Sequence, residues 1–320
     1  CQHIGDWYVR ISSLLVLDRL APESATAISV LVVVRTIPKL IFAHLGGILA
    51  DSMDRRKMLL ALDLIGSIVT LGFVVAIQVK SLSMFYIVSA LRAIIDALYA
   101  PNTKSLVTML VSDSQGLKHA TTINGVVWAL MVAVGGIIAG KTEVFLGIEA
   151  CYFFDSATYI ISALVLWLLP GEYKVLKNEI LPVTKDIAKQ TTKERIIKKT
   201  LGPLILFYEM LNGVIVYLYN CGFGVLVLLK ASGAFSWGAS DVLNAVYAYV
   251  PDDENATSNR LGIIFSCIGL GCLIGPLGAN FVTSPDRAGS QQLVCICGFI
   301  FIMFAWLGFS QVYSFLSICI

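Results

Sequence analysis

The feature that most constrains the fold of this chain is a series of long apolar runs separated by short polar connections. About twenty apolar residues make a helix long enough to cross a membrane, and about nine such runs follow one another here. Of the residues, 57% are hydrophobic and 14% are charged, whereas roughly a quarter are charged in soluble domains. A soluble fold would need a core larger than 320 residues can enclose. The sequence therefore predicts an all-α membrane protein.

Polar residues and helix breakers between the apolar runs set the expected boundaries of the membrane spans. The expected spans are 3–20, 26–50, 58–79, 84–111, 120–140, 144–169, 224–250, 260–282 and 292–310. Residues 170–202 are polar, and we expect 203–222 to form a helix on the membrane surface. Residues 313–320 would begin a further span, and the first residue is not Met, so we expect the chain to be a fragment.

The distribution of basic residues predicts how the spans are oriented. Lys and Arg concentrate in the connections after the even-numbered spans, above all in residues 170–202, and cytoplasmic connections are enriched in these residues. We therefore expect these connections to face the cytoplasm. Asn255 begins an Asn-Ala-Thr glycosylation sequon in the acidic connection PDDENATSN, which this orientation places outside. We expect a monomer in the bilayer of a plasma membrane, with an organelle membrane as the alternative.

The composition also argues against several classes of function. A net charge of +2 is too small to indicate a nucleic-acid partner. The eight cysteines show no zinc spacing and lie mostly in apolar runs, so we expect no metal site. The three histidines are scattered, and the chain has no phosphate-binding Walker loop. We therefore expect neither an enzyme nor a cofactor.

The apolar pattern is interrupted most abruptly by GGILADSMDRRK, residues 46–57, between the second and third spans. Glycines let membrane helices approach closely, and Asp51 can accept hydrogen bonds at a helix N-terminus. Arg55 and Arg56 can reach a carboxylate or the carbonyls of a helix C-terminus. Such residues could form a latch that holds one state of a moving bundle. The alternative is a simple orientation signal, which would require the basic residues alone.

This stretch resembles the loop signature G-x-L-A-D-R/K-x-G-R-R/K of the major facilitator superfamily. The matching positions are Gly47, Leu49, Ala50, Asp51, Arg55 and Arg56. Ser52 replaces the usual basic residue, and Asp54 replaces the second glycine. Further stretches are similar to the family branch that contains enterobactin and macrolide exporters. They are Gly5-Asp6-Trp7, Arg35-Thr36-Ile37-Pro38, residues 101–124 and Trp237-Gly238-Ala239.

The resemblance covers essentially the whole chain and implies a major facilitator type helical bundle of twelve spans. About nine to ten of them would be present here. It implies an N-terminal six-helix half at 1–169, a cytoplasmic linker with a surface helix at 170–223, and part of the C-terminal half at 224–320. It further implies a secondary active transporter, which we expect to export a small organic molecule in exchange for protons. The alternatives are a facilitative uniporter or uptake carrier, or a non-transporting receptor on the same scaffold.

Charged residues inside the spans are candidates for proton coupling or substrate binding, because they are costly within a membrane. Arg92 and Asp96 lie one helical turn apart. Arg92 either acts on a nearby carboxylate or anionic substrate group, or forms an ion pair with Asp96 that serves packing. Arg35 and Lys39 also lie one turn apart and require a carboxylate from another span. The candidates for that carboxylate are Asp6, Asp63, Asp96 and Asp155.

Asp6 is the carboxylate of most interest, because the resemblance places the first span beside the central cavity. Proton-driven exchange needs a carboxylate that takes up a proton inside the protein, although Asp6 could instead lie in water near the end of its span. Residues 134–140, VGGIIAG, resemble an antiporter signature in which Gly136 replaces Pro, with tight helix packing as the alternative. Trp7 and Trp128 are interpreted as packing or interface residues, with cavity lining as the alternative.

Overall fold

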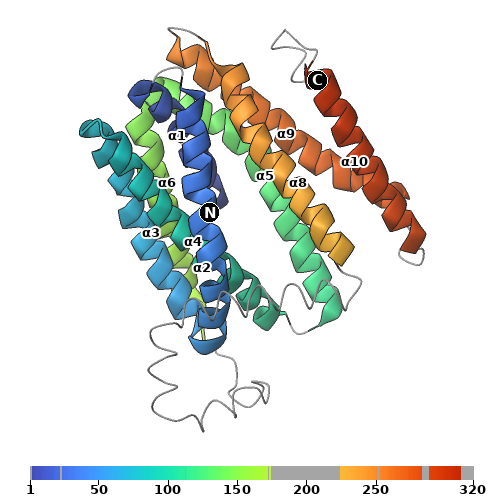
Figure 1. Ribbon diagram of the computed structural model, residues 1–320. Coiled ribbons are helices and arrows are strands. Elements are labelled where there is room, and N and C mark those ends of the chain that lie inside the picture. The colour runs from blue at the N-terminus through green and yellow to red at the C-terminus, as the bar shows by residue number, and fades with distance from the viewer. Residues whose placement is uncertain are drawn as a thin grey trace, which may run out of the picture.

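The computed structural model describes residues 2–21, 24–111, 113–171, 173, 224–250, 253–282 and 288–310. These residues form α-helices connected by short segments (Figure 1). The helices are α1 (Gln2–Leu20), α2 (Ala25–Ser52), α3 (Arg55–Gln78), α4 (Leu82–Leu110), α5 (Ser114–Leu146), α6 (Ile148–Leu168), α8 (Gly224–Ala248), α9 (Glu254–Val282) and α10 (Ala288–Ser310). Six stretches within the described helices are long and apolar enough to cross a membrane. The predicted all-α membrane fold is confirmed.

Each of the nine expected spans corresponds to one of these helices, and the largest differences lie at the two ends of α5 and at the beginning of α9. Both helices start about one and a half turns before the expected position. In each case an aspartate just before the helix accepts a backbone hydrogen bond from its first turn: Asp113 from Gly116 N at 2.8 Å, and Asp253 from Ala256 N at 2.8 Å. The expected surface helix at 203–222 lies outside the described residues.

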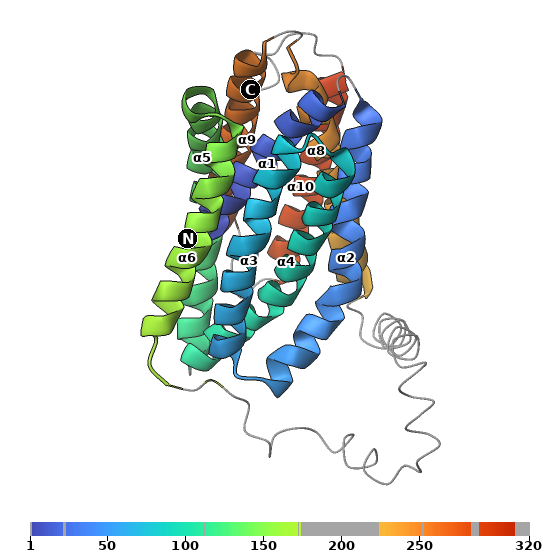
Figure 2. The ribbon, with the colours of Figure 1, turned by 90° about the vertical axis from the view of Figure 1, so that its left-hand side faces the viewer.

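Serine side chains mark where α2 and α4 begin. The first backbone N–H groups of a helix lack partners within it, and a side-chain oxygen at the N-cap supplies one. Ser24 caps α2 by accepting from Ala27 N at 3.2 Å, and Ser81 caps α4 by accepting from Met84 N at 3.3 Å. These caps let the sequence start a new helix within a few residues of the previous one, which gives the tight up-and-down arrangement of Figure 2.

Helix α1 lies at the centre of the described bundle. It packs against α5 and α6, while α2 pairs with α4 and α3 packs against both α4 and α6. The side chains of Ile11, Leu15 and Leu17 on α1 are buried. In contrast, apolar side chains on the outer helices are exposed, as lipid-facing residues are, for example Ile68 on α3 and Ile87 on α4. A central α1 is therefore surrounded by helices that shield its polar residues from lipid.

Helices α5 and α9 form a close seam built from small residues. A Cβ atom added to Gly136 would lie 2.9 Å from the carbonyl oxygen of Gly262, and one added to Gly140 would lie 2.8 Å from the carbonyl oxygen of Ser258. Larger residues would force the helices apart, since such contacts are well inside van der Waals distance. The glycines of the VGGIIAG stretch therefore serve close packing of α5 on α9, which agrees with the packing alternative.

Candidate functional site

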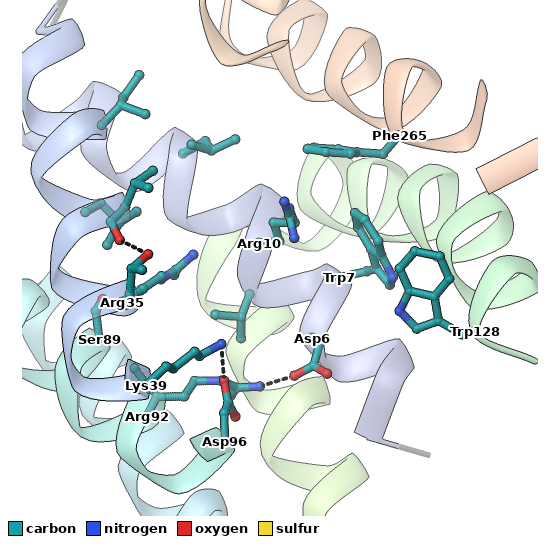
Figure 3. A pocket seen from close by; sticks show the side chains of 17 residues that line it. Asp6, Trp7, Arg10, Arg35, Lys39, Ser89, Arg92, Asp96, Trp128 and Phe265 are labelled. Atoms are coloured by element: carbon teal, nitrogen blue, oxygen red, sulfur yellow. Dashed lines mark hydrogen bonds and ion pairs between the residues drawn. The ribbon is translucent and has the colours of Figure 1, made fainter. Parts of the chain in front are cut away.

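A cavity of about 370 Å³ lies in the middle of the described bundle. It is lined by α1, α2 and α4, with Trp128 from α5 and Phe265 from α9 (Figure 3). All four site candidates predicted from charge inside the spans line this cavity: Asp6, Arg35, Arg92 and Asp96. The helical spacing could suggest that these residues face inward, but only the packing of α1 against the other helices brings them into one cavity.

Arg92 is the centre of a charged network that joins three helices. Its guanidinium lies 2.8 Å from Asp6 Oδ1 on α1 and donates to both carboxylate oxygens of Asp155 on α6, at 3.3 Å for Oδ1. It also donates to Thr70 Oγ1 at 2.8 Å, and this hydroxyl donates to Asp155 Oδ2 at 3.1 Å. The side chain of Asp155 is fully buried, whereas that of Asp6 is 43% exposed. Asp6 therefore faces the cavity, and Asp155 holds Arg92 from behind.

The residue before Asp6 is a glycine because α1 passes close to Asp155. A Cβ atom at Gly5 would lie 1.9 Å from Asp155 Oδ1 and 2.5 Å from Thr158 Oγ1. Any larger residue would push α1 away from α6 and separate Asp6 from Arg92. Gly5 thus allows α1 to pack closely against α6 and places Asp6 near Arg92, which the sequence alone did not reveal.

The ion pair within α4, which was one of the two alternatives for Arg92, does not form. Asp96 instead lies 3.0 Å from Lys39 Nζ on α2, and the partners of Arg92 are Asp6 and Asp155. The reason is that α2 and α4 run side by side, which brings Lys39 opposite Asp96. Of the carboxylate candidates for Arg35 and Lys39, Asp96 forms an ion pair with Lys39. The Arg35 guanidinium instead donates a hydrogen bond to Ser13 Oγ at 2.6 Å.

Aromatic residues form the other side of the cavity. Trp7, Trp128 and Phe265 lie opposite the charged residues of α2 and α4 in Figure 3. The Trp7 and Phe265 ring centroids are 5.1 Å apart, and the Arg10 guanidinium lies 5.2 Å from the Trp7 centroid. Trp7 is buried in the core, as the packing interpretation expected, and both tryptophans also line the cavity, which was the alternative.

Some cavity residues were missed from the sequence. Arg10 and Phe265 were not singled out, nor were the hydroxyls of Ser13 and Thr70 that bind the buried guanidinium groups. A signal existed for Arg10, which lies one turn after Asp6 on the same helix face. Serine and threonine carry no such signal, because their hydroxyls also bind the backbone of their own helix.

The loop between α2 and α3 attaches the start of α3 to its neighbours. Asp54, which replaces the usual glycine, is the N-cap of α3 and accepts from Lys57 N at 3.1 Å. Arg55 is buried and donates to the Met109 sulfur on α4. Arg56 donates to the carbonyls of Leu166, Trp167 and Gly171 at 2.9, 2.6 and 3.2 Å, at and just beyond the end of α6. Asp54 thus fixes the start of α3, and the two arginines hold α3 against α4 and α6.

Of the other loop residues, Gly46 and not Gly47 makes the close contact. A Cβ at Gly46 would lie 2.8 Å from the Ala97 carbonyl oxygen, whereas one at Gly47 would meet nothing within 4 Å. The side chain of Asp51 lies outside what the structure describes. Asn255 is exposed, but it lies in the first turn of α9 and not in a loop, and the Thr257 hydroxyl of its sequon accepts from Val250 N at 3.0 Å.

Comparison with known proteins decides the family. The sequence profile of the Major Facilitator Superfamily matches residues 8–320. The chain belongs to this family. The helices, the loop and the central cavity described above are therefore parts of a major facilitator fold, and the chain is an integral membrane protein that crosses the bilayer several times. The family is one of transporters and not of enzymes.

Two known proteins illustrate how far the similarity extends. The chain is 20% identical over 229 residues to "Uncharacterized MFS-type transporter YfiS" of Bacillus subtilis (strain 168). The aligned stretch covers 72% of this chain and 54% of that protein. The chain therefore spans about half the length of this curated relative. A crystal structure of a mutant of the peptide transporter POT in complex with sulfate is 14% identical. It superposes with a TM-score of 0.43, covering 97% of this chain and 69% of that one.

Proposed function

We propose that this protein is a secondary active transporter that moves a small organic molecule across the membrane by alternating access. The observation that carries the proposal is the Arg92 network inside the central cavity. Charged groups within a membrane protein are costly, and they are typical of substrate and proton pathways. A cavity of about 370 Å³ is also within the size range of small-molecule sites.

The packing of α5 supports alternating access. Its second half lies against α9, where the Ser258 hydroxyl donates to Glu143 Oε2 and Gly136 meets Gly262. In its first half, all side chains of residues 121–128 are exposed. The two helices thus meet at one end of the cavity and not at the other. In the orientation indicated by the basic connections, the closed end is the outer one.

Proton coupling is proposed to act through Asp6. This carboxylate is open to the cavity and shares Arg92 with the buried Asp155. Uptake of a proton by Asp6 would remove one of the two negative partners of Arg92, which would weaken the attachment of α1 to α4. Helix α1 also packs against α5 and α9. A looser attachment of α1 to α4 would therefore also alter the contacts of α1 with the seam between α5 and α9 that closes the cavity. The export direction itself rests on the motif resemblance to the exporter branch.

The transport proposal is tested with the protein in proteoliposomes. Labelled benzoate, adenosine and tetraphenylphosphonium provide an anionic, a neutral and a cationic cargo. We expect efflux of at least one of them above empty liposomes, and faster efflux when the outside is acidic. Absence of flux for all three, together with failure to exchange solutes from a wider panel, would favour the receptor. Flux that is independent of the pH gradient would favour the uniporter.

The coupling role is tested with Asp6→Asn in the same vesicles. We expect solute exchange to persist and the acceleration by the pH gradient to disappear, because the amide cannot take up a proton. Asp18→Asn is the matched control, since Asp18 lies on the same helix but outside the cavity lining. Full pH dependence in Asp6→Asn would remove Asp6 from the coupling mechanism.

The loop at 46–57 is proposed to act as the conformational latch. The support is that Arg55 and Arg56 attach α3 to the ends of α4 and α6, while Asp54 caps the start of α3. We expect Asp51→Asn to abolish flux in the vesicle assay while the protein still inserts and purifies normally. Wild-type flux in this variant would contradict the latch and leave the loop as an orientation signal.

A further inference from the structure

The Arg35 guanidinium carries a charge that no acidic side chain balances within the described part of the chain. Arg35 lines the cavity from α2, and its hydrogen bond goes to Ser13 Oγ at 2.6 Å. A hydroxyl satisfies one N–H group but supplies no negative charge. Asp96, the acid on the facing helix, lies 3.0 Å from Lys39 instead. Since charged groups inside proteins are almost always paired, this arrangement leaves room for a negative partner from outside the chain.

The lining of the cavity as a whole is also positive. Its cationic residues are Arg10, Arg35, Lys39 and Arg92, and its acidic residues are Asp6 and Asp96. Asp155 behind Arg92 adds one more negative charge, and the positive groups still outnumber the negative ones. A concave, low-dielectric site with an excess of one sign of charge favours ligands of the opposite sign. An organic anion is therefore favoured here over an organic cation.

The opposite wall indicates what else the ligand carries. Trp128 presents exposed aromatic surface across the cavity from α2 and α4 (Figure 3). Trp7 and Phe265 are buried behind it, and the Arg10 guanidinium lies 5.2 and 5.4 Å from their ring centroids. Aromatic rings favour contact with flat apolar groups. A small inorganic anion would leave this wall without contacts, whereas a molecule with an acidic group at one end and an aromatic or apolar body would use both walls.

We propose that the cavity binds an amphipathic organic anion, whose acidic group contacts Arg35 and whose apolar body lies against Trp128. The planar guanidinium can donate two parallel hydrogen bonds to a carboxylate, sulfonate or phosphate group. This inference rests on the proposed function in one respect, namely that the bound anion is the transported molecule. Arg35 is then the residue that selects for the charge of the cargo.

Binding of matched probes to the detergent-purified full chain tests the proposal without requiring transport. The probes are 2-naphthoate, 2-naphthylmethanol and 2-naphthylmethylammonium, which share one ring system and differ in charge. We expect 2-naphthoate to bind most tightly, measured by calorimetry and by thermal stabilisation. In Arg35→Gln we expect its affinity to fall about 10- to 100-fold, because a hydrogen bond to a charged group is lost.

Two further variants keep the test decisive. Arg35→Lys retains the charge, so it should keep the preference for 2-naphthoate even if Arg35→Gln fails to fold. Lys104→Gln removes an exposed charge of α4 outside the cavity and should bind like the unaltered protein. Preference for the ammonium probe, equal binding of all three probes, or an Arg35→Gln variant with unchanged affinity would each overturn the proposal.

The outcome is distinguishable from failure of the transport proposal. If 2-naphthoate binds through Arg35 but no solute crosses the vesicle membrane, the anion site stands and the receptor replaces the transporter. If the vesicles carry tetraphenylphosphonium and not benzoate, the transporter stands and the anion site is wrong.

Discussion

Two aspartates, Asp155 on α6 and Asp63 on α3, are both fully buried but have opposite surroundings. Asp155 accepts hydrogen bonds from Arg92 and Thr70. Neither carboxyl oxygen of Asp63 has a hydrogen-bond partner among the described residues. An unpaired carboxylate is very costly at such a site, so we expect Asp63 to be neutral and Asp155 to be ionised. Burial of an acid in this bundle therefore does not by itself identify a functional group.

The difference between the two aspartates follows from their neighbours. Asp155 faces α1 and α4, the helices that supply the charged lining of the cavity, and it is connected to the cavity through Arg92 and Asp6. Asp63 lies on α3, which supplies no residue to that lining. The proposed coupling role therefore belongs to the network of Asp155 and not to Asp63. Variants of Arg92, Asp155 and Asp63 test this distinction.

The largest effect is expected from Arg92→Gln. The variant leaves the fully buried Asp155 with Thr70 as its remaining side-chain donor among the described residues, and removal of one partner of a buried pair costs about 3–5 kcal/mol. We expect the free energy of unfolding in mixed detergent micelles to fall by this amount. Asp155→Asn combined with Arg92→Gln should restore much of the loss, because the double variant contains no unpaired buried charge. Transport should not return, since the network is gone.

The control for this series is Lys104→Gln, an exposed position on α4. It should change the free energy of unfolding by less than about 0.5 kcal/mol. If Arg92→Gln is as mild as Lys104→Gln, then Asp155 is not ionised. In that case the contrast with Asp63 disappears.

The smallest effect is expected from Asp63→Asn. An amide has nearly the shape of a neutral carboxyl group, so we expect the free energy of unfolding to change by less than about 1 kcal/mol. Transport and its dependence on the pH gradient should remain in the vesicle assay. A loss of pH-driven flux in Asp63→Asn, with flux kept in Asp6→Asn, would move the proton site from the cavity to α3.

Much of the fold could be predicted from the sequence, because a membrane helix is encoded locally. The length of an apolar run and the polar residue before it determine where the helix lies, as the N-caps Ser24 and Ser81 illustrate. The family resemblance of the loop at 46–57 was equally local. Errors in helix bounds arose where an aspartate, as at Asp113, started the helix earlier than the hydrophobic pattern indicated.

The sequence by itself determined which charged residues would lie inside the membrane, since Asp6, Arg35, Arg92 and Asp96 all interrupt apolar runs. Only the tertiary structure decided their partners. Spacing within one helix suggested Arg92 with Asp96, but packing placed α2 beside α4 and α1 beside α6, which gave both residues other partners. Ion pairs within a membrane protein depend on which helices adjoin, and helix adjacency is a property of the whole bundle.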